Sequence, residues 1–290
     1  MVMGNRPRVS VIVPARNEEK FLADAVGSVL RQTWKDLEII VVNDGSEDRT
    51  AELADGFARK DARVRVIHRK VGGGLSSARN AGIAAAAGEL ICFLDADDVL
   101  LPEKLERQVA FLDQFPCCDL VFSDWYVGDS TLTPLYLWRC QPPNLPMHEV
   151  LVYGTWFAPM TPLMRARLVE RTGPFDESLR GAEDWDYWIR ASGCGALSYL
   201  PGPVAVYRLH ARQMHRDWAL MRNAREGVMR KHFKPGTRKL EVARAATALR
   251  EAVSHWERRH YAGVAASLLS CLWYARSPRT LRKLGMLCPI

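Results

Sequence analysis

Apolar and polar positions alternate in blocks along the first third of this 290-residue chain. Short apolar runs at residues 9–13, 37–42, 64–68 and 90–94 have the length and the β-branched content of buried strands. The segments between them, residues 18–31, 46–58 and 76–87, have helical spacing or the small residues of a closely packed helix. This alternation predicts an α/β fold with a mostly parallel sheet covered by helices on both faces.

The second half of the chain has a less regular pattern. Residues 120–127 and 157–165 are expected to be strands, residues 183–192 have helical spacing, and the proline-rich stretch 134–146 predicts a mobile surface loop. Three further helices are expected at residues 218–232, 237–258 and 261–274. We therefore predict an α/β domain at residues 1–215, with halves at about 1–98 and 99–215, and a helical C-terminal region at residues 216–290.

The net charge of +7 is concentrated at the C-terminal end. Residues 216–290 contain 16 lysines and arginines against 5 acidic residues, whereas residues 1–215 contain 24 against 28. The mildly acidic main body argues against a nucleic-acid partner. The basic end suggests contact with an anionic surface, and a membrane interface is one candidate.

Composition narrows the class of protein further. The longest apolar stretch, residues 262–275, is shorter than the ~20 residues of a membrane-spanning helix, and no apolar run of a secretory signal follows the first residues. The seven cysteines are odd in number and show no Cys-x-x-Cys spacing, which favours reduced thiols over disulfides or a zinc site. These features predict a cytoplasmic protein, with the basic end as the part that would bind a membrane peripherally.

Polar residues follow three of the predicted strands. They form the segments 14–18, 43–45 and 95–98. Because ligands bind beyond the carboxyl ends of parallel strands, these segments are expected to meet at one edge of the sheet. The alternative is that they are only the turns and helix caps that every α/β protein needs.

The acidic cluster Asp95-Ala96-Asp97-Asp98 ends the apolar run 90–94. Its three carboxylates repel one another unless a cation or hydrogen-bond donors neutralise them. Mg²⁺ and Mn²⁺ take oxygen ligands and commonly join one or two carboxylates to substrate phosphates. The alternative role for Asp97 or Asp98 is to cap the helix that begins near Pro102.

Two further residues are candidates for nucleotide contacts. Asp44 could accept a hydrogen bond from the edge of a nucleobase, or could be an ordinary turn residue before Gly45. Arg79 is a charged residue among small ones, so it would face either a phosphate or base, or solvent.

A second acidic group, Glu183-Asp184-Trp185-Asp186-Tyr187-Trp188, mixes carboxylates with aromatic rings. Partly apolar surroundings raise the pKa of a carboxyl group toward the range of a general base, and aromatic faces suit sugar rings. The alternative is an acidic first helical turn whose aromatic residues pack in the core. His210, in the segment 207–210, is a candidate metal or phosphate ligand, although a lone histidine is more often structural.

Taken in order, five segments resemble glycosyltransferase family 2, the inverting enzymes of the GT-A fold. They are VIVPARNE at 11–18, VVNDGS at 41–46, ARNAG at 78–82, FLDADD at 93–98 and GAEDW at 181–185. The resemblance covers roughly residues 8–215 and implies transfer of a sugar from a UDP-sugar to an acceptor hydroxyl on a glycan or a lipid-linked molecule. The rival enzyme class, a nucleotidyltransferase that makes nucleotide sugars, should carry a Gly-rich basic loop after the first strand, and here Pro14 follows it. A non-catalytic binding protein with the same fold is the third interpretation.

The resemblance also implies a role for each matching residue. Asp184 would be the general base, Asp97 and His210 would hold a divalent Mn²⁺ or Mg²⁺, and Glu183 and Trp185 would contact the acceptor. The donor would be bound by nine residues: Pro14, Ala15, Arg16, Asn17, Glu18, Asp44, Arg79, Asp95 and Ala96. The chain departs from the family at Gly72-Gly73-Gly74, where an Asn-containing loop is more usual, and we expect the glycines to loosen this segment.

Overall fold

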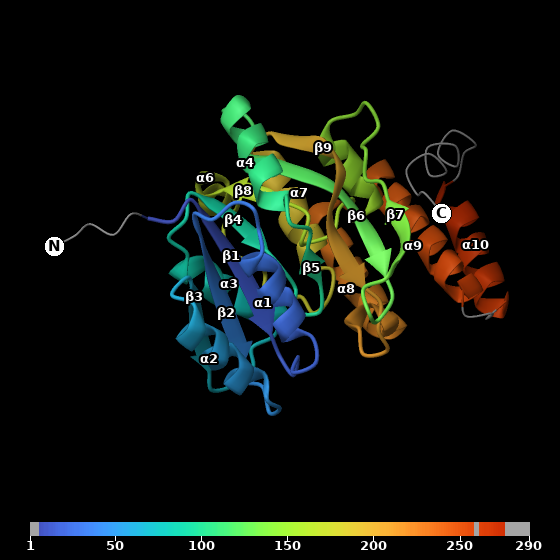
Figure 1. The fold of residues 1–290 in the computed structure, drawn as a ribbon. Coiled ribbons are helices and arrows are strands. Elements are labelled where there is room, and N and C mark those ends of the chain that lie inside the picture. Colours follow the sequence, from blue (N-terminus) through green and yellow to red (C-terminus); the bar gives the residue numbers. More distant parts are fainter. Residues whose placement is uncertain (1–5, 258–260, 276–290) are drawn as a thin grey trace.

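The computed structural model describes residues 6–257 and 261–275 (Figure 1). Its strands are β1 (Val9–Ala15), β2 (Leu37–Asp44), β3 (Val64–Arg69), β4 (Leu90–Phe93), β5 (Val99–Leu100), β6 (Leu120–Gly128), β7 (Pro134–Trp138), β8 (Leu163–Arg165) and β9 (Leu197–Arg208). Its α-helices are α1 (Leu22–Leu30), α2 (Thr50–Lys60), α3 (Leu75–Ala85), α4 (Lys104–Gln114), α5 (Met147–Val150), α6 (Ala166–Thr172), α7 (Glu183–Cys194), α8 (Trp218–His232), α9 (Arg238–Glu257) and α10 (Tyr261–Ala275). Two 3₁₀ turns, η1 (Leu151–Tyr153) and η2 (Met214–Arg216), complete the described elements.

One mixed sheet runs through the molecule in the order β3-β2-β1-β4-β8-β6-β9-β5. The first four strands along the chain pair in parallel, as the alternating pattern predicted. Pairing in the other half is mixed, because β8 is antiparallel to both β4 and β6 whereas β9 is parallel to β6. The expected mostly parallel sheet is therefore confirmed for the first half only, and the whole is a mixed α/β sheet.

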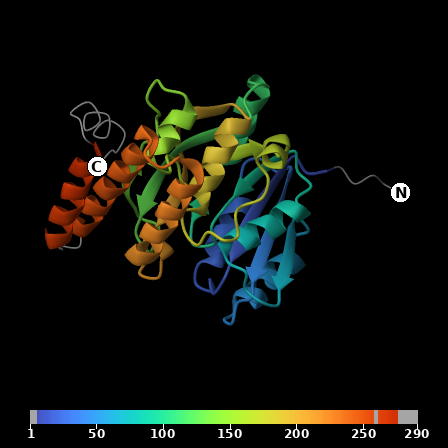
Figure 2. The ribbon, with the colours of Figure 1, turned by 180° about the vertical axis from the view of Figure 1, so that it is seen from behind.

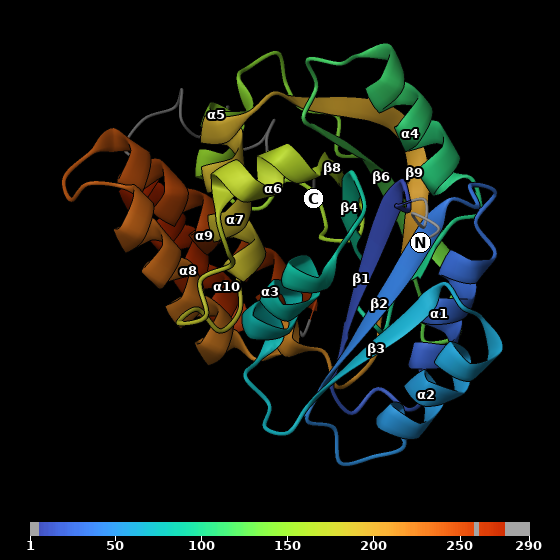
Figure 3. The same cartoon turned by 90° about the vertical axis from the view of Figure 1, so that its left-hand side faces the viewer.

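Helices cover both faces of this sheet, as predicted (Figure 3). Helices α1 and α2 lie on one face, and α3, α6 and α7 lie on the other. Strand β1 is buried along its whole length, as expected for a strand covered on both faces. Its carboxyl end, with those of β2 and β4, forms one edge of the sheet.

The prediction of a loop over residues 134–146 was wrong in its first part. Residues 134–138 form β7, which pairs with β6 alone. Pro134 stands at the first position of this edge strand, where a missing N–H removes no essential ladder bond.

The sequence pattern also missed β9, because Pro201-Gly202-Pro203 interrupts it. A bulge opposite Asp124 lets β9 keep its pairing with β6 on both sides of the interruption. The Asp124 carboxylate accepts hydrogen bonds from the Tyr199 hydroxyl at 2.9 Å and from the Gly202 amide at 3.0 Å. A buried side chain thus supplies partners that the sheet ladder lacks there.

The three predicted C-terminal helices are present as α8, α9 and α10. Buried residues of α8 and α9, such as Val228 and Ala243, belong to the same apolar cluster as the sheet. Figure 2 shows α8 next to α7 on one face of the molecule. Within the described residues, every helix is too short or too polar to span a bilayer.

Candidate active site

The edge formed by β1 and β2 is held together by hydrogen bonds between the two following loops. The Asn17 amide donates to the Ser46 hydroxyl at 3.0 Å, and the Asn17 side chain accepts from the Glu47 amide at 2.9 Å. The Glu18 amide donates to Thr50 at 2.8 Å. Asn17 has a positive φ of 58°, which turns the chain sharply after β1. Within the segment predicted to bind the donor, Pro14 and Ala15 are buried, whereas Arg16 and Asn17 are exposed.

Asp44, at the end of β2, anchors the glycine-rich loop. Its carboxylate accepts hydrogen bonds from the Gly73 and Gly74 amides at 3.0 and 2.8 Å and pairs with Arg69 at 2.8 Å. The side chain is almost completely buried. We expected the glycines to loosen this segment, but backbone amides held by a buried carboxylate fix the loop at this point.

The three carboxylates after β4 have three different partners. Asp95 pairs with Arg79 at 2.7 Å, Asp97 contacts His210 at 2.9 Å, and Asp98 accepts a hydrogen bond from the Arg208 amide at 2.9 Å. Asp98 is buried and lies well before the start of α4, so the suggestion that it caps this helix was wrong. Strand β9 ends at Arg208, and its antiparallel pairing with β5 brings Arg208 and the following His210 to the cluster.

Negative charge accumulates on this edge of the sheet. Burial raises the pKa of Glu18 to about 7, and the charges of Asp97, Asp48 and Asp95 contribute in the same direction. The pKa of Asp97 is also raised, by burial and by Asp95, and His210 opposes this shift. Carboxylates with raised pKa values that face one another are the setting that a divalent cation neutralises.

The side chains present therefore fit a hard cation, with oxygen ligands from Asp97 and a nitrogen ligand from His210. Among residues 6–257 and 261–275, no three His, Cys, Asp or Glu side chains make a ligand set by themselves. Mg²⁺ commonly binds through one or two protein ligands, with water and substrate phosphates completing the shell.

Arg79 connects this edge with α7, 104 residues further along the chain. Its guanidinium pairs with Asp95 at 2.7 Å and with Glu183 at 2.8 Å, and its side chain is 1% exposed. It also lies over the Phe175 ring, 5.3 Å from the centroid. With both carboxylate partners already in place, Arg79 is positioned to fix Asp95 and Glu183 relative to each other.

Asp184, the expected base, lies in the first turn of α7 beside this bridge. It accepts hydrogen bonds from the Trp185 amide at 2.7 Å and from the Thr155 hydroxyl at 3.1 Å. Burial raises its pKa to about 6, helped by the charge of Glu183 and opposed by Arg79 and by the two hydrogen bonds. A carboxyl group with this pKa is ionised near neutral pH and still basic enough to take a proton.

The two predicted acceptor residues are less accessible than expected. Glu183 is occupied by Arg79, and Trp185 is 2% exposed, with its indole N–H donating to the Leu151 carbonyl at 2.7 Å. The Trp185 ring packs 6.5 Å from that of Phe233, so α7 and the segment after α8 share this part of the core.

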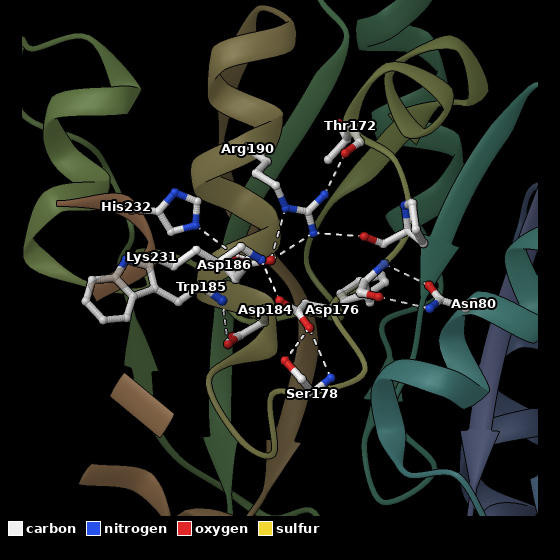
Figure 4. A network of polar contacts seen from close by, with 12 residues as sticks. Asn80, Thr172, Asp176, Ser178, Asp184, Trp185, Asp186, Arg190, Lys231 and His232 are labelled. Atoms are coloured by element: carbon white, nitrogen blue, oxygen red, sulfur yellow. Dashed lines mark hydrogen bonds and ion pairs between the residues drawn. The ribbon is translucent and has the colours of Figure 1, made fainter. Parts of the chain in front are cut away.

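Asp186, one further residue along α7, is the centre of a separate network (Figure 4). It pairs with Arg190 at 2.9 Å, Lys231 at 2.8 Å and His232 at 2.7 Å. Lys231 and His232 belong to α8, so this network attaches the C-terminal helices to the helix that carries Asp184. Sequence analysis missed it, because nothing local indicates that residues 186 and 232 meet.

Residues 10–161 match the family model described as glycosyl transferase family 2, and this region is slightly more than half of the chain. The chain belongs to glycosyltransferase family 2. The chain is 39% identical to the uncharacterized glycosyltransferase EpsJ of Bacillus subtilis, over 64% of this chain and 56% of that protein. It is 30% identical to an uncharacterized glycosyltransferase of Haemophilus influenzae, over 73% of this chain and 68% of that protein. The chain thus spans little more than half the length of the first of these family 2 relatives.

Solved structures of glycosyltransferases share the fold. Mannosyltransferase PcManGT from Pyrobaculum calidifontis, in complex with GDP-Man and Mn²⁺, superposes with a TM-score of 0.63 at 20% identity, over 98% of this chain and 80% of that one. Residues 1–349 of S. aureus TarS, in complex with UDP-GlcNAc, give a TM-score of 0.61 at 18% identity, over 91% of each chain. The predicted GT-A fold is confirmed. The family 2 match ends at residue 161, so Glu183, Asp184 and His210 lie beyond it.

Proposed function

We propose that this glycosyltransferase is an inverting enzyme that moves a sugar from a UDP-sugar to an acceptor hydroxyl, with Asp184 as the general base. The observation that carries the proposal is the Asp95–Arg79–Glu183 bridge, which joins the acidic edge of the sheet to the helix turn that bears Asp184. A donor held at the acidic edge and an acceptor held at this turn of α7 would meet across the bridge.

The chemical step follows from the state of Asp184. Its carboxylate takes the proton of the acceptor hydroxyl, whose oxygen attacks the anomeric carbon from the face opposite the leaving group. The bond between that carbon and the phosphate oxygen breaks, and UDP leaves with the electron pair. Attack from the opposite face inverts the anomeric configuration.

On the donor side, residues 14–18 and the ends of β2 and β4 would hold the nucleoside and the diphosphate. Asp97 and His210 would hold Mn²⁺ or Mg²⁺, which when bound stabilises the negative charge of the leaving diphosphate. Arg79 and Asp95 would act as a pair, with Arg79 fixing the orientation of Asp95 toward the ribose. Asp44, which anchors the glycine loop, would also accept a hydrogen bond from the uracil edge.

A nucleotide-sugar screen by thermal shift, with and without Mn²⁺, tests the donor. A UDP-sugar is expected to stabilise the protein by about 2.7 kcal/mol at a hundredfold excess over its Kd, and only when Mn²⁺ is present. The Asp97→Asn variant should lose the metal dependence. A stronger response to GDP-sugars would contradict uracil as the nucleobase of the donor. A UDP-sugar response that does not depend on metal would contradict the role of Asp97.

Product analysis separates the enzyme classes. Transfer or slow hydrolysis of a UDP-sugar with release of UDP supports the proposal. Formation of pyrophosphate from UTP and a sugar phosphate would instead identify a nucleotidyltransferase. Nucleotide-sugar binding without either reaction, over a range of glycan and lipid-linked acceptors, would identify a binding protein.

We also propose that α10 contacts an anionic membrane surface, where a lipid-linked acceptor would be found. Four of its large apolar side chains are 42–71% exposed: Leu268, Leu269, Leu272 and Trp273. The sequence after α10 adds basic residues, including Arg276 and Arg279. Apolar side chains beside basic ones are typical of helices that lie in the interface.

Vesicle flotation tests this second proposal. Wild type is expected to bind vesicles of mixed phosphatidylglycerol and phosphatidylcholine, and the Leu269→Ser, Trp273→Ser double variant to bind more weakly. A matched control is Val71→Ser, which alters an apolar side chain that is 79% exposed but lies far from α10 in the chain. Equal binding by all three proteins would overturn the membrane contact.

A further inference from the structure

Two arginines of the C-terminal helices approach the helix turn that carries Asp184. Arg250, on α9, donates from Nη2 to the Thr155 carbonyl at 3.1 Å, and the Thr155 hydroxyl donates to Asp184 at 3.1 Å. The guanidinium of Arg250 passes directly over Gly154, where any side chain would collide with it. Gly154 has a φ of +123°, a conformation that favours glycine.

Arg225, on α8, is the second of the pair. Its Nη1 atom is buried and has no hydrogen-bond partner within the described residues. Burial and the neighbouring Arg250 lower the pKa of Arg225 to about 10, against the opposing effects of Glu251 and Asp184. Arg225 is thus a partly buried cation within the electrostatic range of the proposed base.

The acidic residues near this pair are already engaged. Glu251, the nearest on α9, accepts two hydrogen bonds from Arg222, each at 3.1 Å. Glu226, beside Arg225 in the chain, pairs with Arg244 at 2.6 Å and with Arg230 at 3.2 Å. These arginines of α8 and α9 have carboxylate partners, whereas Nη1 of Arg225 has none.

A buried guanidinium nitrogen without a hydrogen-bond partner costs stability, so Nη1 of Arg225 is suited to a ligand that supplies negative charge. Guanidinium groups bind phosphate and carboxylate through paired hydrogen bonds, and two of them together suit a doubly charged or multidentate anion. The donor diphosphate is expected at Asp97 and His210, after β4 and β9. On the other side of the proposed reaction, Arg250 contacts Gly154 and Thr155, just after η1, and Arg225 lies within electrostatic range of Asp184.

We propose that Arg225 and Arg250 form an anion-binding part of the acceptor site, and that the acceptor carries a phosphate or carboxylate group close to the hydroxyl that receives the sugar. This inference rests on the proposed function, because it takes Asp184 as the base that the acceptor approaches. It assigns the C-terminal helices a direct part in acceptor recognition.

Isothermal titration of the full-length protein with inorganic phosphate tests the site. UDP and Mn²⁺ are kept saturating and the ionic strength is held constant, so that phosphate cannot occupy the donor site. We expect wild type to bind phosphate, and both Arg225→Gln and Arg250→Gln to weaken binding by about 10- to 100-fold. The matched control is Arg230→Gln, because Arg230 lies on the same helix with its side chain 75% exposed and should leave the phosphate affinity unchanged.

Several results would overturn the proposal. One is phosphate affinity that is equal in wild type and the Arg225 and Arg250 variants. A second is loss of UDP affinity in those variants with phosphate affinity unchanged, which would assign the pair to the donor site. A third is loss of phosphate binding that accompanies unfolding. Since Nη1 of Arg225 has no hydrogen-bond partner among the residues that the structure describes, the melting temperature of Arg225→Gln should match or exceed that of wild type, and Arg225→Lys should retain part of the phosphate affinity.

Phosphate binding is measured without turnover, so the two proposals fail separately. A protein that binds phosphate through Arg225 but transfers no sugar from any UDP-sugar would overturn the proposed function and support the anion site. A protein that transfers sugar equally well in wild type and Arg225→Gln, at limiting concentrations of a phosphorylated acceptor, would do the reverse.

Discussion

Asp184 and Asp186 lie in the same turn of α7 and have opposite electrostatic surroundings. Burial would raise the pKa of Asp186, but hydrogen bonds from His232, Lys231 and Arg190 outweigh it and hold this pKa well below the ordinary range. Asp184 has no cation paired to it directly, and burial beside Glu183 raises its pKa to about 6. The same residue type, two positions apart in one helix, is a charged anchor at position 186 and the proposed proton acceptor at position 184.

This difference in pKa separates a structural role, at Asp186, from the catalytic role proposed for Asp184. The Asp186 network holds α7 against α8, and the buried Asp186 carboxylate is the acidic centre that Arg190, Lys231 and His232 share. Asp184 lies in a less favourable setting for a carboxylate, which suits the proposed role of a base that must gain a proton. The anchor thus fixes the backbone on which the reactive group depends. The predictions below separate these two roles.

The largest effect is expected from Asp184→Asn. General-base catalysis contributes typically ~10²–10⁴-fold to the rate, so transfer should fall by a factor in this range. Binding of UDP and Mn²⁺ should be unchanged, since neither ligand needs the base. Steady-state kinetics with a UDP-sugar and calorimetry with UDP measure the two quantities. Turnover within a few-fold of wild type would remove Asp184 from the mechanism.

Asp186→Asn should act on stability instead. Removing one member of a buried charge network leaves uncompensated charges, at a cost of about 3–5 kcal/mol in the free energy of unfolding. Since Lys231 and Arg190 keep some solvent contact, the lower end of that range is expected, measured by urea denaturation.

Asp176→Asn is the matched control for the anchor. Asp176 also pairs with Lys231, at 2.6 Å, but both side chains are more exposed than Asp186. Exposed pairs contribute about 0.2–1 kcal/mol, so this variant should lose no more than that. Equal losses in the two variants would contradict the distinction drawn between a buried anchor and a surface pair.

The pH dependence of transfer should report the pKa of Asp184. Below about 6 the base is protonated, so kcat/KM should fall by roughly tenfold for each further pH unit. Binding of UDP and Mn²⁺ measured over the same pH range corrects for titration on the donor side. A corrected profile that stays flat down to pH ~5 would show that the residue is ionised there and that its surroundings do not raise its pKa.

The smallest effect is a gain of stability in Asp184→Asn. The folded pKa of about 6 lies above the ordinary 3.8, so the folded state binds the proton more tightly. The contribution of Asp184 to stability therefore falls as pH rises from about 4 to about 6, and it stays low above that. At pH ~7.5 the variant should be more stable than wild type by on the order of 1 kcal/mol, allowing for partial solvent contact.

Thermal melts at two pH values check the sign of this effect. The difference between the variant and wild type should shrink as pH falls through 4 and disappear near pH ~3, because Asp184 is then protonated in both the folded and the unfolded protein. A variant that is less stable than wild type at neutral pH would show that the carboxylate is held by favourable contacts, as Asp186 is.

Short-range pattern was enough to predict much of the fold and part of the site. The apolar runs gave β1 to β4 with the correct parallel order, and the spacing after residue 215 gave α8, α9 and α10. Asp97 and His210 lie 2.9 Å apart, and the metal that they would share, which the family resemblance implied, stays a prediction. The strands, the helices and the polar edge depend on local periodicity and on the rule that parallel strands end at one edge, both of which can be read from a sequence.

Contacts between distant residues decided the rest. The Arg79–Glu183 pair spans 104 residues, and nothing near either residue indicates the other. Edge strand β7 and the bulged strand β9 depend on pairing with β6, which overrides the prolines that made their segments look irregular. The burial of Trp185 also depends on distant segments, because its indole donates to Leu151 in η1 and its ring packs near Phe233, just after α8.

The sequence by itself determined the family, the parallel strands of the first half and the identity of the acidic groups at the edge of the sheet. Only the tertiary structure decided which of these acids is neutralised. The pKa of a carboxyl group depends on burial and on the charges around it, and those charges come from elements far along the chain. Asp184 and Asp186 are alike in the sequence, and α8 makes them different.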